Sequence, residues 1–244
     1  MFSVAVLLFL FGIFCWLLSS IAAGGGALLF LPLARLVLEP HDVPAVIAVA
    51  SVISSLHRTF LYRHSVVKRV WSANVSGLLI GTFLGGFFLK HVEADWLGLL
   101  VGVFLVVLSI QHFHGFKVSA FKPKTIHFSG LSLCTASIST VVGVAGPLMN
   151  PLYLRAGILK ESMIGTKAAS TLFMQVGKLT VFSTLGMLTD SALLLGVVVG
   201  VGALAGNWLG RYALKILSSG QFTNYVYIAL LVSGLATILE SISD

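Results

Sequence analysis

Charge is scarce in this sequence. Only 9% of its 244 residues are Asp, Glu, Lys or Arg, against about 25% in a typical soluble domain. This number of charges is too small to cover the surface of a soluble domain. Most of the surface must therefore face lipid. The polar connections are too short to hold a separate soluble domain, and the alternating strand pattern of a β-barrel is absent. The sequence therefore predicts an all-α polytopic membrane protein.

Acidic residues and cysteines are also few: the chain has eight Asp and Glu residues and two cysteines. It contains no HExxH and no GxSxG motif, and His112 and His114 are too isolated to form a closed metal site. We therefore expect no enzyme activity, no cofactor and no metal. The net charge of +7 comes from basic residues between apolar segments, so it indicates membrane topology and not nucleic-acid binding.

Hydrophobic blocks dominate the rest of the chain. Six of them have about the 20 residues needed to cross a bilayer, near 43–62, 66–89, 94–113, 162–186, 191–214 and 221–240. Two further blocks, 2–38 and 126–157, are interrupted, the first by three glycines at 24–26 and the second by "GVAGP" at 143–147. Glycine adopts the positive φ angles of a sharp break, and proline suits the first turn of the next helix. Each interrupted block therefore predicts a re-entrant hairpin of helix, break and half-helix.

The chain also aligns with itself. At an offset of 119 residues, four landmark residues of the first half meet the same residue types in the second: Cys15 and Cys134, Ser20 and Ser139, Gly24 and Gly143, Pro32 and Pro151. Two inserted residues later, "GTFLG" at 81–85 meets "GALAG" at 202–206, and we interpret these GxxxG segments as helix-packing surfaces. The shared order predicts two repeats in one transmembrane domain, residues 1–122 and 123–244.

Basic residues indicate that the two repeats have opposite orientations. The connection after the first full span of the first repeat holds four of them: Arg58, Arg63, Lys68 and Arg69. The corresponding connection of the second repeat, residues 184–190, holds none. Because basic connections face the cytoplasm, both termini are predicted to lie outside the plasma or inner membrane. Each repeat is then a glycine-broken re-entrant hairpin plus three transmembrane helices, the inverted-repeat architecture of many secondary transporters.

The glycine breaks predict an anion site. A short helix that begins at a break inside the membrane directs unpaired N–H groups and its positive dipole end into the protein. Two such ends, entering from opposite faces, would bind an anion. Ser19, Ser20, Ser139 and Thr140 lie just before the breaks. Their hydroxyl groups can donate to an anion or bond to their own helix backbone instead.

A polar stripe on one helix adds charge to this site. Lys167, Thr171, Gln175 and Lys178 recur at steps of four, four and three. Lys178 is the most deeply placed charge, so it is the expected countercharge. Arg58 and Lys167 lie nearer the cytoplasmic boundary, where their side chains can equally reach the headgroups. The candidate substrate-binding residues are Ser20, Gly24, Gly25, Gly26, Ser51, Thr140, Gly143, Gly146, Pro147, Asn150, Thr166, Ser170, Thr171, Gln175 and Lys178.

Several of these motifs occur together in one known family. The segments "GGGALLFLPL", "AVIAVASVISS", "GTFLGG", "GVAGPLMNPLY", "MIGTKAAST" and "GKLTVFSTLGML" resemble those of the TauE/SafE family, also described as sulfite exporters or DUF81 proteins. The resemblance implies a multi-pass plasma-membrane permease for small sulfur-containing anions. It places the family's glycine motifs on Gly24, Gly25, Gly26 and Pro32 and on Gly143, Gly146 and Pro151. Val144 and Ala145 stand where the family often has glycine, and Ala48 where it often has threonine. These departures bear on the substrate more than on the fold.

The sequence thus predicts a secondary transporter for a small anion, a sulfur-containing oxyanion or an organosulfonate, with a central site exposed alternately to either side. The expected partners are that anion and the lipid bilayer, and a homodimer is allowed. The alternative is a transmembrane thiol–disulfide electron carrier, because Cys15 and Cys134 occupy the same repeat position. Their apolar neighbours, as in "FCWLL", are typical of cysteines that act as small hydrophobic residues.

Overall fold

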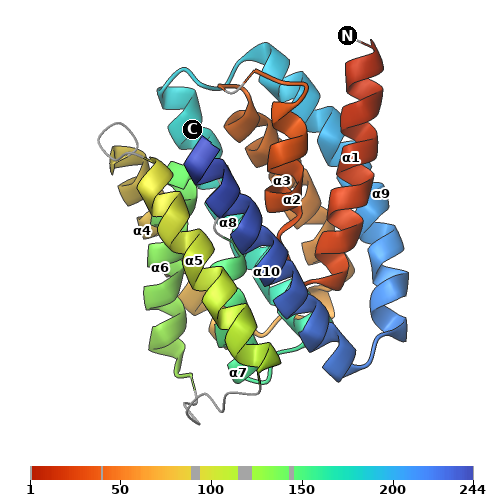
Figure 1. The fold of residues 1–244 in the computed structure, drawn as a ribbon, viewed down its shortest axis with the longest axis vertical. Coiled ribbons are helices and arrows are strands. Elements are labelled where there is room, and N and C mark those ends of the chain that lie inside the picture. The colour runs from red at the N-terminus through yellow and green to blue at the C-terminus, as the bar shows by residue number, and fades with distance from the viewer. Residues whose placement is uncertain (1, 40, 89–93, 115–122, 143–145, 244) are drawn as a thin grey trace.

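The protein is built from helices (Figure 1). The computed structural model describes residues 2–39, 41–88, 94–114, 123–142 and 146–243, and no strand occurs in these ranges. The predicted all-α fold is confirmed. The elements are α1 (Phe2–Ile21), α2 (Gly26–Arg35), α3 (Val43–Leu61), η1 (Arg63–Ser65), α4 (Lys68–Phe88), α5 (Ala94–Phe113), α6 (Thr125–Val142), η2 (Gly146–Met149), α7 (Asn150–Arg155), α8 (Lys160–Thr184), α9 (Asp190–Ile216) and α10 (Ser219–Ser243).

Helix lengths are those of a multi-pass membrane protein. Six described helices, α1, α3, α4, α6, α9 and α10, are long and apolar enough to cross a membrane. α8 has 25 residues but a more polar sequence. α2 has only ten residues, a rise of about 15 Å, which is half of a typical hydrocarbon core. Both interrupted blocks therefore consist of a long helix followed by a short one, α1 with α2, and α6 with η2 and α7.

Contacts between the helices follow a reciprocal pattern. α1 packs along α9, and α6 packs along α4; α3 also packs on α9, and α8 on α4. The remaining large contacts join α3 to α8 and α5 to α10. If α1 to α5 are matched in order with α6 to α10, the α1–α9 contact corresponds to the α6–α4 contact, and the α3–α9 contact corresponds to the α8–α4 contact. The α3–α8 and α5–α10 contacts each correspond to themselves. A two-fold relation between the predicted repeats would produce this pattern.

The chain ends lie toward the same end of the bundle in Figure 1, whereas α5 ends and α6 begins at the opposite end. If each half of the chain crosses the membrane an odd number of times, both chain ends must lie on one side and the connection between the halves on the other. That the termini lie outside, and that the halves are inverted repeats, stay predictions.

Glycines let two pairs of helices approach closely. A Cβ atom built on Gly81 of α4 would lie 2.2 Å from the carbonyl oxygen of Leu133 on α6. A Cβ atom built on Gly206 of α9 would lie 2.3 Å from the carbonyl oxygen of Ile13 on α1. Only glycine fits at such distances, so the GxxxG segments pack helices together, as predicted.

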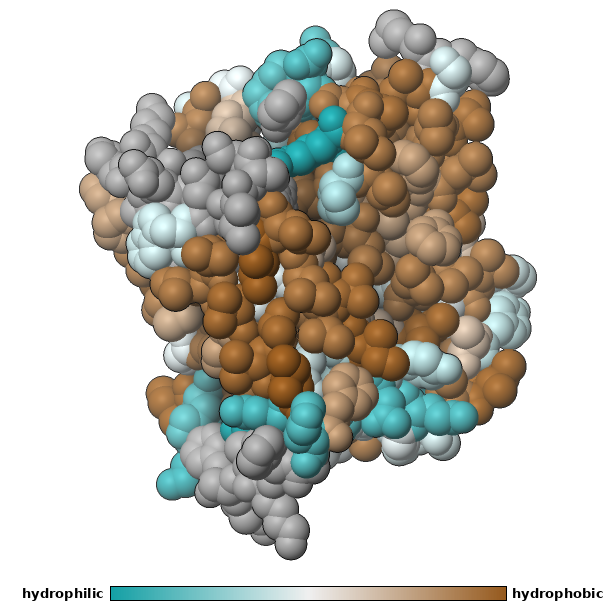
Figure 2. Space-filling view, in the orientation of Figure 1, coloured by the Kyte–Doolittle hydropathy of each residue, from teal (hydrophilic) through white to brown (hydrophobic). Residues whose placement is uncertain are grey.

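The surface of the protein is apolar where a soluble protein would be polar. Figure 2 shows an apolar band across the middle of the visible face and hydrophilic residues toward both ends. Large exposed apolar side chains occur along α4, α5, α9 and α10, among them Phe87, Phe104, Trp208 and Leu235. Buried polar side chains instead gather on α1, α3, α6 and α8. An apolar exterior that suits lipid therefore encloses an interior that has polar groups among its apolar core residues.

Candidate functional site

The first break consists of three residues in the left-handed backbone region. Ala23, Gly24 and Gly25 have φ angles of 54°, 121° and 94°, and α2 begins directly afterwards at Gly26 without a side-chain cap. The first N–H groups of a helix have no intrahelical partner, so here they and the positive dipole end point into the protein. The predicted break and half-helix are confirmed in the first half of the chain.

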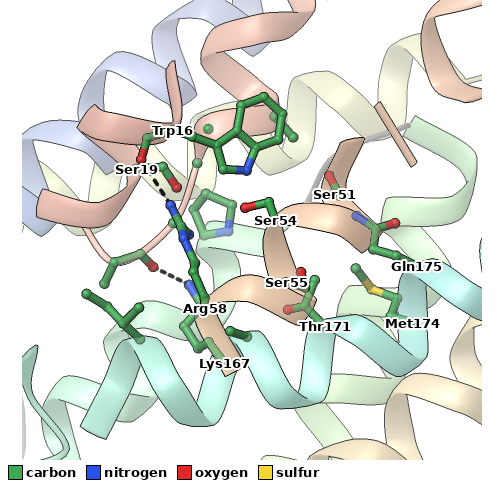
Figure 3. Close-up of a pocket in the computed structure, with 18 of the residues that line it drawn as sticks. Trp16, Ser19, Ser51, Ser54, Ser55, Arg58, Lys167, Thr171, Met174 and Gln175 are labelled. Atoms are coloured by element: carbon green, nitrogen blue, oxygen red, sulfur yellow. Dashed lines mark hydrogen bonds between the residues drawn. The ribbon is translucent and has the colours of Figure 1, made fainter. Parts of the chain in front are cut away.

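This break forms one wall of a cavity of about 100 Å³, which we call the first cavity (Figure 3). Its size is several times what one water molecule needs. The other walls come from α1, α3 and α8, with Ser139 contributed by α6 and Pro147 by η2. Its polar lining residues are Ser19, Ser51, Ser54, Ser55, Arg58, Ser139, Lys167, Thr171 and Gln175. The described lining thus contains two cations and no acid, which makes the cavity electropositive.

Lys167 connects the two halves at this cavity. Its Nζ donates to the carbonyl oxygen of Ala23 at 2.6 Å and to Oδ1 of Asn150. Ala23 belongs to the first break, and Asn150 begins the short helix after the second. An ammonium group has three donor hydrogens, so one hydrogen of Lys167 is left for a ligand once these two bonds are made. Figure 3 shows the Lys167 side chain reaching from α8 toward the break.

Arg58 is a buried cation near the carboxyl end of α1. Its Nε donates to Oδ1 of Asn207 at 2.6 Å. Its Nη2 donates to the carbonyl oxygen of Trp16 at 3.1 Å and to Oγ of Ser20 at 3.0 Å. Nδ2 of Asn207 donates in turn to Oγ of Ser54 at 2.9 Å. A cation beside the last carbonyl groups of a helix is favourable, so Arg58 holds the end of α1 next to the break.

The second half has a matching arrangement. Nζ of Lys178 donates to the carbonyl oxygen and to Oγ of Ser139, in the last turn of α6, at 2.5 Å and 2.9 Å. Ser139 corresponds to Ser20 at the repeat offset, and Lys178 lies one residue beyond the counterpart of Arg58. Lys178 lies 11 residues from Lys167, about 16 Å along α8, and does not contribute to the described lining of the first cavity.

A second cavity, of about 20 Å³, adjoins the first. It shares three lining residues with the first cavity: Lys167, Thr171 and Met174. Its other polar groups are Ser170 of α8 and residues of α4, α6 and α7, where Asn74 donates to the hydroxyl of Tyr153 and accepts from Oγ of Ser132 at 2.8 Å. The buried Oγ1 of Thr135, also on its wall, has no partner in the described part of the chain. The second cavity is therefore polar, with one hydroxyl left for a water molecule.

The predicted substrate-binding residues fall into groups. Those that line the first cavity are Gly24, Gly25, Gly26, Ser51, Pro147, Thr171 and Gln175, and Ser170 lines the second. Three more hold the ends of the breaks without lining the first cavity: Ser20, Asn150 and Lys178. The hydroxyl of Thr140 bonds to its own helix, and that of Thr166 accepts from the backbone N–H of Val67. Gly146 begins η2, and Gly143 lies outside the described residues.

Seven polar or aromatic residues line the first cavity without being in the predicted set: Trp16, Ser19, Ser54, Ser55, Arg58, Ser139 and Lys167. Position along a span is the only measure of depth in a sequence, and it places Arg58 and Lys167 near the boundary. A usable signal was present, however. Ser51, Ser55 and Arg58 recur at steps of four and three, the same helical spacing that marks the stripe on α8.

Gln175 brings an unpaired polar atom to the first cavity. Its Oε1 is buried and has no hydrogen-bond partner among the residues that the structure describes, and the residue is only 6% exposed. An unpaired buried polar atom costs about 1–3 kcal/mol, so such an atom in a cavity wall indicates a contact for a ligand or a water molecule.

The comparison with known families decides the class of the protein. The family model of the sulfite exporter TauE/SafE matches residues 8–237. The chain belongs to this family. TauE/SafE proteins are membrane transporters for sulfite and related sulfur compounds, so the polar cavities described above lie inside a transporter. No match was found among curated proteins or among solved structures.

Proposed function

We propose that the protein is a secondary transporter that carries a small anion, a sulfur-containing oxyanion or an organosulfonate, by alternating access around the first cavity. One observation carries the proposal. The described wall of this cavity combines Arg58, Lys167 and the uncapped start of α2 with no acidic residue. A cavity of this charge attracts anions and repels cations.

The energetics favour an anion that is stripped of most of its water. Taking an ion out of water costs several kcal/mol, so its new surroundings must replace the lost hydration. Lys167 offers its third hydrogen, the serines of α3 offer hydroxyl groups, and the first turn of α2 offers backbone N–H groups. These donors act at a low local dielectric, where each bond is stronger than in water. We assign Lys167 the direct contact with the anion.

Lys178 has a different role in this proposal. Its ammonium is bonded to Ser139 at the end of α6, as Arg58 is bonded to Ser20 at the end of α1. We therefore assign Lys178 to positioning the second break, in place of the countercharge role expected from the sequence. The reciprocal contacts of the two halves support a mechanism in which the halves exchange conformations and open the site to either side in turn.

Flux into liposomes tests this function. The purified full chain would be reconstituted and offered sulfite, thiosulfate, sulfoacetate, sulfate and chloride separately. We expect saturable flux of at least one sulfur-containing anion. The Lys167→Gln variant should reduce this flux about 10- to 100-fold, since a hydrogen bond to a charged group contributes about 1.5–3 kcal/mol.

Lys160→Gln is the matched control, because Lys160 begins the same helix and lines neither cavity. It should transport like the wild type. Flux of chloride alone would refute the substrate class, and wild-type flux by Lys167→Gln would refute the role of the first cavity.

No observation favours the thiol–disulfide carrier. Cys15 is buried on α1, Cys134 is exposed on α6, and both are free thiols. The two cysteines therefore lie in different surroundings.

A further inference from the structure

Lys167 lines both the first and the second cavity. Its role in anion binding explains its contact with the first cavity but not its contact with the second. In the first cavity it faces the uncapped start of α2 and the serines of α3. In the second it faces an uncharged group of hydroxyls and one amide. One ammonium group is therefore in reach of two separate polar spaces.

The groups that can carry charge around Lys167 are few. α3 contributes Arg58 and α7 contributes Tyr153, while α1, α2, α4, α6 and η2 contribute no titratable group to the described walls of either cavity. Arg58 keeps its proton under all ordinary conditions. Tyr153 is neutral near pH 7 in its ordinary form. Lys167 is thus the titratable cation on these described walls that can give up its proton, because a lysine ammonium loses its proton readily when it is buried.

Anion binding and protonation of Lys167 must favour each other. A buried charge without a counter-ion is costly, and a buried ionisable group escapes that cost by becoming neutral. An anion in the first cavity removes the cost, because it pairs with the ammonium group. The state of Lys167 that binds the anion is therefore the charged one, and departure of the anion favours loss of the proton.

We propose that Lys167 carries one proton with each anion, so that the protein is a proton–anion symporter; this inference rests on the proposed function. The amine nitrogen of Lys167 takes up a proton as the anion enters the site from one side of the membrane. When the site opens to the other side, the anion leaves and the N–H bond breaks. The proton passes to water. A monovalent anion then moves without net charge, and a divalent anion moves one negative charge.

The second cavity offers that proton an acceptor site separate from the anion. About 20 Å³ is enough for a single water molecule but too little for an oxyanion. The unpaired hydroxyl of Thr135 and the bonded groups of Ser132, Asn74 and Tyr153 surround this space. A water molecule bonded to Thr135 beside Lys167 would accept its proton.

Calorimetry tests the coupling at the binding step. The purified full chain is titrated with sulfate, thiosulfate and sulfoacetate, which stay ionised near neutral pH, in two buffers of different ionisation enthalpy. The difference gives the number of protons taken up per anion. We expect uptake of up to one proton in the wild type, rising with pH, and affinity that falls by up to about tenfold per pH unit.

Lys167→Arg should bind the anion without proton uptake, because arginine stays protonated. Lys160→Arg, the control on the same helix outside both cavities, should keep the wild-type uptake. Anion binding by the wild type without proton uptake at any pH overturns the coupling and leaves the proposed function intact. Proton uptake that persists in Lys167→Arg also overturns the assignment to Lys167.

A flux measurement decides the matter if Lys167→Arg does not fold. In wild-type liposomes with a clamped membrane potential, an inward anion gradient should acidify the lumen, as read by a trapped pH-sensitive dye. Anion entry without acidification overturns the inference alone. Absence of binding and flux for every sulfur-containing anion overturns the proposed function as well.

Discussion

At the scale of single residues, Gly24 shows why a missing side chain shapes the first cavity. A Cβ atom built on Gly24 would lie 2.8 Å from Nζ of Lys167, and the residue has a φ angle of 121°. The backbone therefore requires glycine at this position, and an added methyl group would displace the neighbouring ammonium group.

The Gly24→Ala variant should bind sulfur-containing anions at least about tenfold more weakly, a loss of about 1.4 kcal/mol, because its methyl group displaces the Lys167 ammonium. Titration calorimetry measures this change. Gly157→Ala is the control, since Gly157 also has a positive φ angle, 70°, but nothing lies within 4 Å of its added Cβ. The control should lose stability through backbone strain and keep its affinity. Equal affinity of the two variants would show that the contact with Lys167 does not matter.

The Gln175 side chain is expected to lower the stability of the protein and to strengthen its binding of the anion. Replacing it with methionine removes an unpaired buried acceptor at nearly constant volume, so Gln175→Met should be as stable as the wild type or more stable. Its KM for the anion should nevertheless rise several-fold, because a ligand contact is lost. Thermal unfolding in detergent and liposome flux measure the two effects.

Asn207 provides the comparison for that experiment. Its amide is bonded to Arg58, Ser20 and Ser54, so Asn207→Leu should lower the melting temperature by leaving Arg58 partly unpaired. If Gln175→Met unfolds as early as Asn207→Leu, then Gln175 supports the fold and not the ligand.

At the scale of elements, each long helix before a break ends beside a cation from the next long helix. Arg58 does this for α1, and Lys178 does it for α6. The last carbonyl groups of a helix carry partial negative charge. Removal of either cation would leave those groups unneutralised in a place that water does not freely reach.

The Lys178→Ala variant should therefore abolish anion transport while its expression stays normal. Lys178→Arg should also impair transport, because the planar guanidinium does not fit where a compact ammonium contacts both oxygens of Ser139. Flux in proteoliposomes, normalised to inserted protein, is the measurement. Thr180→Ala is the control, since that exposed hydroxyl bonds only to its own helix. Normal transport by Lys178→Ala would remove this residue from the mechanism.

The glycine contacts make a separate prediction about helix packing. Gly81→Leu places a side chain against the carbonyl oxygen of Leu133 and should destabilise the protein by about 1–3 kcal/mol. Thermal unfolding in detergent should show a lower melting temperature. Gly130→Leu on α6 should leave it unchanged, because nothing lies within 4 Å of the added Cβ. Equal melting temperatures for both variants would mean that α4 and α6 separate without cost.

At the scale of the whole molecule, the sequence defines the helices better than it defines the site. Span lengths and the glycine breaks predict the bounds of the helices closely, because the bilayer sets their length and glycine sets their interruptions. The site depends on which faces of distant helices meet. Arg58 and Lys167 are near the ends of their spans in sequence, yet both line the first cavity, because α1 and the break after it bring backbone to their depth.

The packing of the helices explains the remaining differences between the site predicted from the sequence and the site in the structure. Lys178 is the deepest charge in the sequence, but the end of α6 packs beside it and takes its hydrogen bonds. Trp16 enters the first cavity from α1, and no spacing rule within one helix would select it. Such residues are determined by contacts between helices far apart in the chain, which one sequence does not record.

The proposed transport requires a small anion bound between the first break and Lys167, and the most direct test is to locate that anion. Selenate, a heavier analogue of sulfate, can be found by its anomalous scattering in crystals of the full chain. We predict a peak in the first cavity, within hydrogen-bond distance of Nζ of Lys167 and of the first N–H groups of α2, and its loss in Lys167→Gln. A selenate peak elsewhere in the protein, or an undiminished peak in Lys167→Gln, would contradict the account.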